Sequence, residues 1–192
     1  MAEEVAYLKE RRDQLVMVLG NESRRKRQEA SHKLAAMARE NPEVVSEIAE
    51  SLIDALELPE AQTRWECLDA LSEVALVRPE CVTDAFDGAE EALFDDGSAS
   101  ARLAAFRFLC RFGSRDAESS RRAWPLMCES IQCYHGDPEY RDMLICLLEF
   151  AQGAIAPEVG DALVGRMSFD AKNGSGYARA YSTEICAVLE RD

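Results

Sequence analysis

Five arginines recur along the sequence at an almost constant spacing of 37 to 39 residues. The residues three, seven and ten positions after each arginine are mostly apolar, and these offsets lie on one face of an α-helix. After the second arginine, for example, they are Cys67, Leu71 and Val74. The spacing therefore predicts that each arginine begins a helix and that one helical unit is repeated along the chain. The five are Arg27, Arg64, Arg102, Arg141 and Arg179.

A second helical pattern precedes these helices. Pro42-Glu43 and Pro79-Glu80 begin two such patterns, and proline suits the first turn of a helix because its missing N–H would have no partner there. Glycine or asparagine lies at turns five to seven residues before most of the arginines, where one helix must end. The sequence predicts an all-α chain of about five antiparallel helix pairs in a single domain, residues 1–192. The predicted pairs lie near residues 3–40, 42–77, 80–113, 117–152 and 157–190.

This pattern resembles HEAT repeats, and more broadly the HEAT/armadillo group of helical repeats. Pro42 and Pro79 match the proline of the first helix, and the recurring arginines match the arginine of the second. Leu58 and His135 replace the aspartate or asparagine that the resemblance leads one to expect in the turns before Arg64 and Arg141. The resemblance implies an α-solenoid, in which stacked helix pairs share a continuous core and the second helices line a curved surface. It implies no particular activity.

Charge is distributed unevenly along the chain. The formal net charge is −14, which disfavours wholesale binding to nucleic acid or to an anionic membrane. Residues 1–40 carry a net charge of +2, residues 42–99 of −14 and residues 100–192 of −2. The basic end of one molecule could meet the acidic middle of another, so weak self-association is one expectation. The sequence shows no signal-peptide pattern, no membrane-spanning apolar run and an odd number of cysteines, so we expect a cytoplasmic protein.

Two groups of residues are candidate binding sites. The later repeats carry apolar residues where the early ones carry charges, and we predict an exposed binding patch there, formed by Phe108, Leu147 and Phe150 with Arg107 and Arg111. The alternative is that these apolar side chains belong to the core. The second group is a basic patch that would suit an acidic partner, or would simply be a solvated helix face. It consists of Arg24, Arg25, Lys26 and Lys33.

The sequence contains no recognisable catalytic motif. It has no P-loop and no dinucleotide fingerprint, and Cys128, Cys133 and His135 lack the fourth ligand that a structural zinc site requires. We therefore predict no metal, no cofactor and no enzymatic activity. The prediction is a protein-binding scaffold or adaptor whose partner is another protein or a peptide.

The alternative is a nucleic-acid-binding or DNA-repair protein that resembles the DNA glycosylases built from HEAT-like repeats. Arg102, Arg107, Arg111 and Arg115 could supply a basic stripe for such a function. The acidic residues of the middle repeats would repel a duplex that spans the array.

Overall fold

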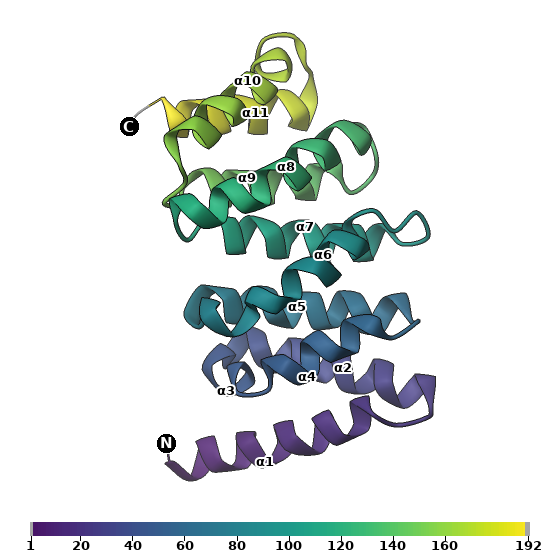
Figure 1. Cartoon of the computed structure of the whole chain (residues 1–192). Coiled ribbons are helices and arrows are strands. Elements are labelled where there is room, and N and C mark those ends of the chain that lie inside the picture. Colours follow the sequence, from purple (N-terminus) through teal and green to yellow (C-terminus); the bar gives the residue numbers. More distant parts are fainter. Residues whose placement is uncertain (1, 191–192) are drawn as a thin grey trace. The chain divides into compact units, whose positions relative to one another are not determined.

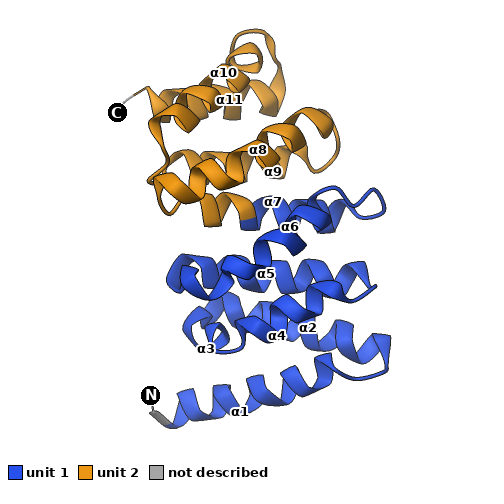
Figure 2. Ribbon diagram, in the orientation of Figure 1, with its two compact units in different colours: residues 1–108 blue, residues 109–192 orange. Residues whose placement is uncertain are grey.

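The computed structural model describes residues 2–190, and every regular element in that range is helical (Figure 1). The all-α prediction is therefore confirmed for this part of the chain. The chain groups into two compact units, residues 1–108 and 109–192, and the division falls within helix α7 (Figure 2). Whether residues 1–192 form a single domain stays a prediction, and each unit is described by itself.

Unit 1 contains the elements from α1 to the greater part of α7. Helix α2 packs against both α1 and α5, and the short elements that follow α2 also cover α5. The elements are α1 (Ala2–Leu19), α2 (Arg24–Glu40), α3 (Pro42–Ser46), α4 (Ala49–Asp54), the 3₁₀ helix η1 (Ala55–Glu57), α5 (Ala61–Val77), the 3₁₀ helix η2 (Pro79–Ala85), α6 (Phe86–Leu93) and α7 (Ala99–Gly113).

The core of unit 1 contains the apolar stripe predicted from the arginine spacing. Cys67, Leu71 and Val74 of α5 are fully buried, and so are Ala30 and Leu34 of α2 apart from a trace of surface on Ala30. Burial of one such leucine contributes about 2 kcal/mol relative to an exposed position. The repeated stripe thus belongs to the core of unit 1.

The first helices of the second and third repeats differ from the prediction, because each is divided into shorter segments. We expected one continuous first helix in each of the pairs near 42–77 and 80–113, whereas the structure has α3, α4 and η1 in the first case and η2 and α6 in the second. The division between α3 and α4 has a physical cause in α1. In a continuous helix the Val44 carbonyl would accept from the Ile48 N–H. Here it accepts from the guanidinium of Arg12 at 2.7 Å, and the Ile48 N–H donates to Val45 instead.

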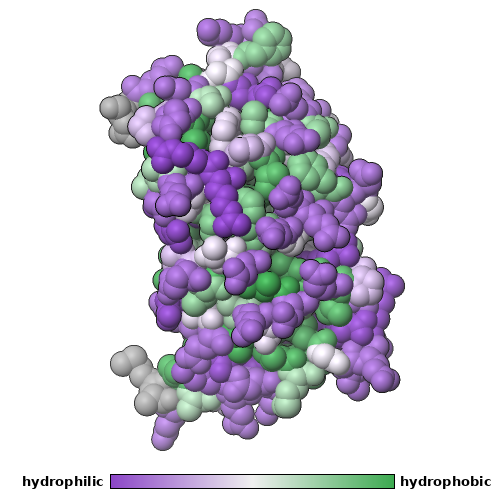
Figure 3. Space-filling model, viewed as in Figure 1, coloured by the Kyte–Doolittle hydropathy of each residue, from purple (hydrophilic) through white to green (hydrophobic). Residues whose placement is uncertain are grey.

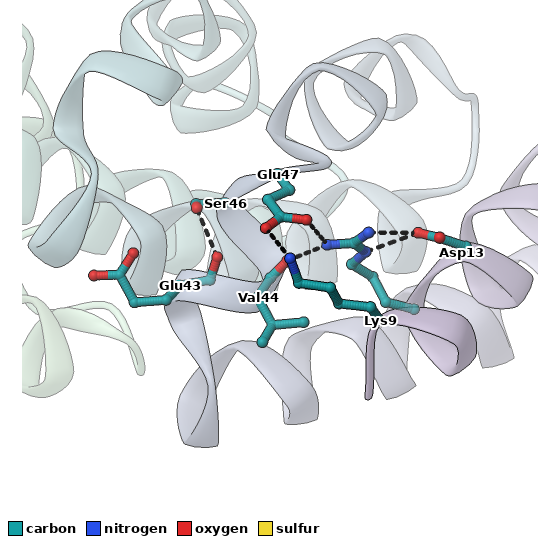
Figure 4. Close-up of polar contacts among 7 residues, drawn as sticks. Lys9, Asp13, Glu43, Val44, Ser46 and Glu47 are labelled. Atoms are coloured by element: carbon teal, nitrogen blue, oxygen red, sulfur yellow. Dashed lines mark hydrogen bonds and ion pairs between the residues drawn. The ribbon is translucent and has the colours of Figure 1, made fainter. Parts of the chain in front are cut away.

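Arg12 is held in this position by a network of carboxylates (Figure 4). It is 6% exposed, and it also donates to Glu47 at 2.6 Å and to Asp13 at 2.7 Å. Lys9 donates to the second oxygen of Glu47 at 2.5 Å. Figure 4 shows the carboxylate of Glu47 directed toward the amine of Lys9 of α1, so these contacts join α1 to the second repeat.

Unit 2 contains α8 (Ala117–Cys133), α9 (Tyr140–Ala151), α10 (Pro157–Asn173) and α11 (Gly176–Leu189) after the end of α7. Helix α10 packs against α8 and α11, and α11 also packs against α9. The loop after α9 lies very close to the end of α7, since the Ala154 N–H donates to the Ser114 carbonyl at 2.8 Å. A Cβ at Gly153 would lie 2.3 Å from that carbonyl oxygen, so this close approach requires glycine.

Candidate binding surface on the second helices

The recurring arginines of unit 1 fasten the turn that precedes their own helix. Arg27 donates to the backbone carbonyls of Asn21 and Glu22, and Arg64 donates to those of Leu58 and Pro59. Arg102 makes the same contact with the turn before α7, at 2.9 Å from the Asp95 carbonyl. The acceptor is a backbone oxygen in each case, so the side chain at the turn position can vary. This explains why Leu58 can replace the asparagine or aspartate that HEAT repeats favour.

Two of these arginines also bind a carboxylate of the following repeat. Arg27 forms an ion pair with Glu60, and Arg64 forms one with Asp95. Glu60 is only 6% exposed, and the hydrogen bond from Arg27 is the main cause that lowers the pKa of its carboxyl. Arg141 and Arg179 differ, because both are exposed and their side chains form no hydrogen bond or ion pair within residues 2–190. The structural role of the repeat arginine is therefore met in unit 1 and not in unit 2.

The prediction that the apolar binding patch is exposed is wrong. Phe108, Leu147 and Phe150 are all 0% exposed, so they are core residues. The cause is that a second helix has neighbours on more than one side, so more than one stripe is buried. At Gly113 of α7, a Cβ would lie 2.9 Å from the ring of Phe150, which shows how closely that ring packs against the helix.

The two arginines of that patch lie next to acids. Arg107 forms an ion pair with Asp69 of α5, and Arg111 lies 4.0 Å from Glu149. Arg115, the last member of the predicted basic stripe, binds Asp116 at 2.6 Å, and Arg102 binds the turn carbonyls. An acid therefore offsets the charge locally for three of the four arginines of the stripe, Arg107, Arg111 and Arg115. This arrangement disfavours the stripe as a surface for phosphate groups.

The predicted basic patch lies on an exposed face of α2. Arg24, Arg25 and Lys26 are exposed and form no hydrogen bond or ion pair within the part of the chain that the structure describes. Lys33 is also exposed and binds Glu29 one turn earlier at 2.5 Å. The preceding residue, Ser23, is the N-cap of α2 and makes no side-chain capping bond, so the first N–H groups of the helix are open to a ligand.

A row of paired charges joins α2 to α5 and α7. His32 of α2 lies 2.9 Å from Glu66 of α5, and Arg39 of α2 lies 3.5 Å from Asp69 of α5, which also binds Arg107. The carboxylates are the less exposed partners, at 9% for Glu66 and 16% for Asp69, whereas His32 and Arg39 are 62% and 51% exposed. The surface of this row is therefore mainly basic. The sequence holds a signal for this row that was not used above, because His32, Asp69 and Arg107 share one repeat position, five residues after their arginines.

The other side chains considered in the sequence make no metal-binding group. Cys128 accepts a hydrogen bond from Arg166, Cys133 is exposed, and His135 pairs with Asp170. Residues 2–190 hold no cluster of three or more histidine, cysteine or acidic side chains placed to bind a metal ion. In the same range, no helix is both long and apolar enough to cross a membrane. On the face in Figure 3, hydrophilic side chains predominate and hydrophobic areas lie scattered between them.

Comparison with known proteins supports the repeat fold. No protein-family model matches the sequence, and no curated protein does. Among solved structures, a designed armadillo repeat protein matches with a TM-score of 0.70 at 15% identity, over 91% of this chain and 80% of that chain. A second designed armadillo repeat protein, in complex with the peptide (KR)4, matches with a TM-score of 0.71 over the same shares, also at 15% identity. Computationally designed armadillo repeat proteins for modular peptide recognition match with a TM-score of 0.69 at 14% identity. The division of two first helices into shorter segments, the buried repeat stripe and these matches together show that the chain has the armadillo/HEAT-like α-solenoid fold.

Proposed function

We propose that this chain is a non-catalytic scaffold that binds an acidic segment of a protein partner on the exposed basic face of α2. The observation that carries the proposal is the set Arg24, Arg25 and Lys26, three exposed cations whose side chains form no hydrogen bond or ion pair within residues 2–190. They lie at the N-terminal end of a helix, where positive charge is unfavourable by a few tenths of a kcal/mol, roughly, for each residue. A bound carboxylate would remove this cost and would also meet the uncapped N–H groups of the helix.

The other residues of this face also favour a negatively charged partner. Lys33 and Arg39 are exposed cations further along α2, although each also pairs with one carboxylate, Glu29 and Asp69 respectively. Glu66 and Asp69 lie behind His32 and Arg39 and fix the positions of these side chains, since ion pairs with partly buried carboxylates restrict rotamers. The solved structures with a similar fold include designed proteins for peptide recognition, which supports a peptide as the kind of ligand. The overall charge of −14 does not prevent this, because charges separated by more than about 8 Å are largely screened at physiological salt.

The test is fluorescence anisotropy with three labelled octapeptides, composed of glutamate, lysine or a neutral glycine–serine repeat, and with a labelled DNA duplex. We expect saturable binding of the glutamate peptide alone, weakened by added salt. The variant Arg24→Glu/Arg25→Glu should lower that affinity about tenfold or more, as loss of about 1.4 kcal/mol implies.

The matched control is Arg141→Glu/Arg179→Glu, which changes the net charge equally at exposed arginines of unit 2. It should leave the affinity for the glutamate peptide within a factor of two or so, since surface charges away from a site act weakly. Equal losses in both variants would reduce the binding to a general charge effect and refute the proposed site. Tighter binding of the DNA duplex than of the glutamate peptide would favour the nucleic-acid alternative.

A further inference from the structure

Unit 2 contains a polar pocket that the proposed function does not use. It has a volume of about 270 Å³ and lies where the ends of α8 and α10 meet the beginning of α9. His135 comes from the turn after α8, Tyr140 from the start of α9, and Arg166 and Asp170 from α10. The volume is close to the roughly 300 Å³ at which small-molecule sites begin, so one amino-acid-sized group would fill it.

Arg166 is the cation of this pocket, and no acid neutralises it directly. It is half-buried, and its only hydrogen bond within residues 2–190 goes to the sulfur of Cys128, at 3.2 Å. A thiol sulfur is a weak acceptor, so the donors of the guanidinium remain largely unsatisfied. A half-buried guanidinium in this state favours an anionic ligand with two oxygens, because its fork of N–H groups matches a carboxylate.

Tyr140 adds an unsatisfied donor beside it. The residue is 1% exposed, and its hydroxyl has no hydrogen-bond partner among the described residues. Burial raises the pKa of Tyr140 to about 12, so the hydroxyl keeps its proton and can donate. The ring of His135 lies 4.8 Å from that of Tyr140 and is the more exposed of the two, so His135 forms the outer wall beside the tyrosine.

The remaining walls restrict the ligand further. Phe169 is 71% exposed at the rim and offers an apolar surface, unusual for so large a side chain. Asp170 would repel an anion, but its Oδ2 accepts from His135 at 2.9 Å, which holds this oxygen toward the histidine. The pocket thus combines a guanidinium without an ion pair within residues 2–190, one buried hydroxyl without a partner there and one exposed aromatic ring.

We propose that this pocket binds a carboxylate attached to an apolar group, with the carboxylate accepting from Arg166 and Tyr140 and the apolar group resting on Phe169. Two sources have this chemistry: the C-terminal residue of a peptide and a free organic acid. The pocket lies in unit 2, whereas the acidic-segment site lies on α2 of unit 1, so either proposal can fail without the other.

The test is an NMR titration of the full chain with N-acetyl-L-phenylalanine, with its primary amide and with 3-phenylpropionate. We expect N-acetyl-L-phenylalanine to bind saturably with a Kd of about 1 mM or lower, a typical value for so small a ligand. The shifts should concentrate on α10 near Arg166 and Phe169. The amide should bind about tenfold more weakly or not at all, since it cannot form the charged pair. Equal binding of 3-phenylpropionate would assign the site to free acids, and its failure to bind would assign it to peptide C-termini.

Variants make the test specific. Arg166→Gln should weaken binding of N-acetyl-L-phenylalanine about tenfold or more. Tyr140→Phe should weaken it and yet leave the unfolding midpoint of the free protein unchanged or higher, because it removes a buried hydroxyl without a partner. Arg121→Gln, an exposed arginine of the same unit paired with Glu158, should change nothing. The proposal is overturned if the amide binds as well as the acid, or if Tyr140→Phe lowers the midpoint without changing the affinity.

Discussion

Replacement of Arg27 by methionine tests the role of the repeat arginine most directly. The change keeps the aliphatic part of the side chain and removes three kinds of contact, with the Asn21 carbonyl, the Glu22 carbonyl and the Glu60 carboxylate. Glu60 would remain in place with 6% of its surface exposed and without its counter-ion. Removal of one partner of a buried ion pair typically costs 3–5 kcal/mol, and the 14% exposure of Arg27 places the expected loss near the lower end, at about 3 kcal/mol.

The measurement is reversible urea unfolding followed by circular dichroism, with thermal unfolding in parallel. For a chain of this size, about 3 kcal/mol corresponds to a fall in Tm of roughly 6 to 12 °C. Arg25→Met is the matched control, because Arg25 is an exposed arginine of the same helix, and it should change the stability by no more than about 0.5 kcal/mol.

A second substitution separates the ion pair from the turn contacts. Arg27→Met/Glu60→Gln removes the stranded charge, so the double variant should be less destabilised than the sum of its single variants, with a coupling of about 1 to 3 kcal/mol. What then remains is the loss of the contacts with Asn21 and Glu22. If Arg27→Met costs less than about 1 kcal/mol, the turn and the carboxylate do not depend on this arginine, and the reasoning from the repeat fails.

Three further outcomes follow from single contacts. Arg12→Met should destabilise the protein by about 2 kcal/mol in urea unfolding, because it leaves the Val44 carbonyl without its charged donor. Gly153→Ala should lower the Tm by several degrees, whereas Gly165→Ala, at a helical glycine with no neighbour within 4 Å of its Cβ, should raise it slightly. Asp116 caps α8 through the Ser119 N–H, which with Arg115 lowers its pKa to about 2. Because this pKa is depressed on folding, its contribution to stability is present above the unfolded value and is lost as the pH falls toward 2. Asp116→Asn should therefore flatten the dependence of urea midpoints on pH between about 5 and 2.

The helices of the fold could be predicted from the sequence because their signal is local. Apolar residues three, seven and ten positions after each arginine lie on one helical face whatever surrounds the helix. The division between α3 and α4 could not be predicted in this way. It depends on Arg12, which lies 32 positions before Val44 in the chain and donates a hydrogen bond to the Val44 carbonyl. No glycine or proline marks the break between the two helices.

The exposure of the candidate binding residues could be predicted less well, for a related reason. The helical period places Phe108 and Phe150 beside the buried stripe of their helices. Whether such positions are buried as well depends on how many helices pack around them. The residues of the basic patch were placed correctly on an exposed face, because charged side chains are seldom buried without partners. The pairs between His32 and Glu66 and between Arg39 and Asp69 depend on the distance between two helices, which the sequence does not contain.

The repeat also determines which cations remain available to a partner. In unit 1 the repeat arginines are occupied by turn carbonyls, and two of them also by carboxylates of the following repeat, so a ligand would have to break those contacts to bind them. Arg24, Arg25 and Lys26 immediately precede such an arginine but lie outside the repeat position, and they have no comparable contacts. A residue that stabilises the fold cannot easily be substituted to suit a new partner, whereas its exposed neighbours can be. Binding specificity in this chain is therefore expected at positions beside the repeat arginines rather than at the arginines themselves.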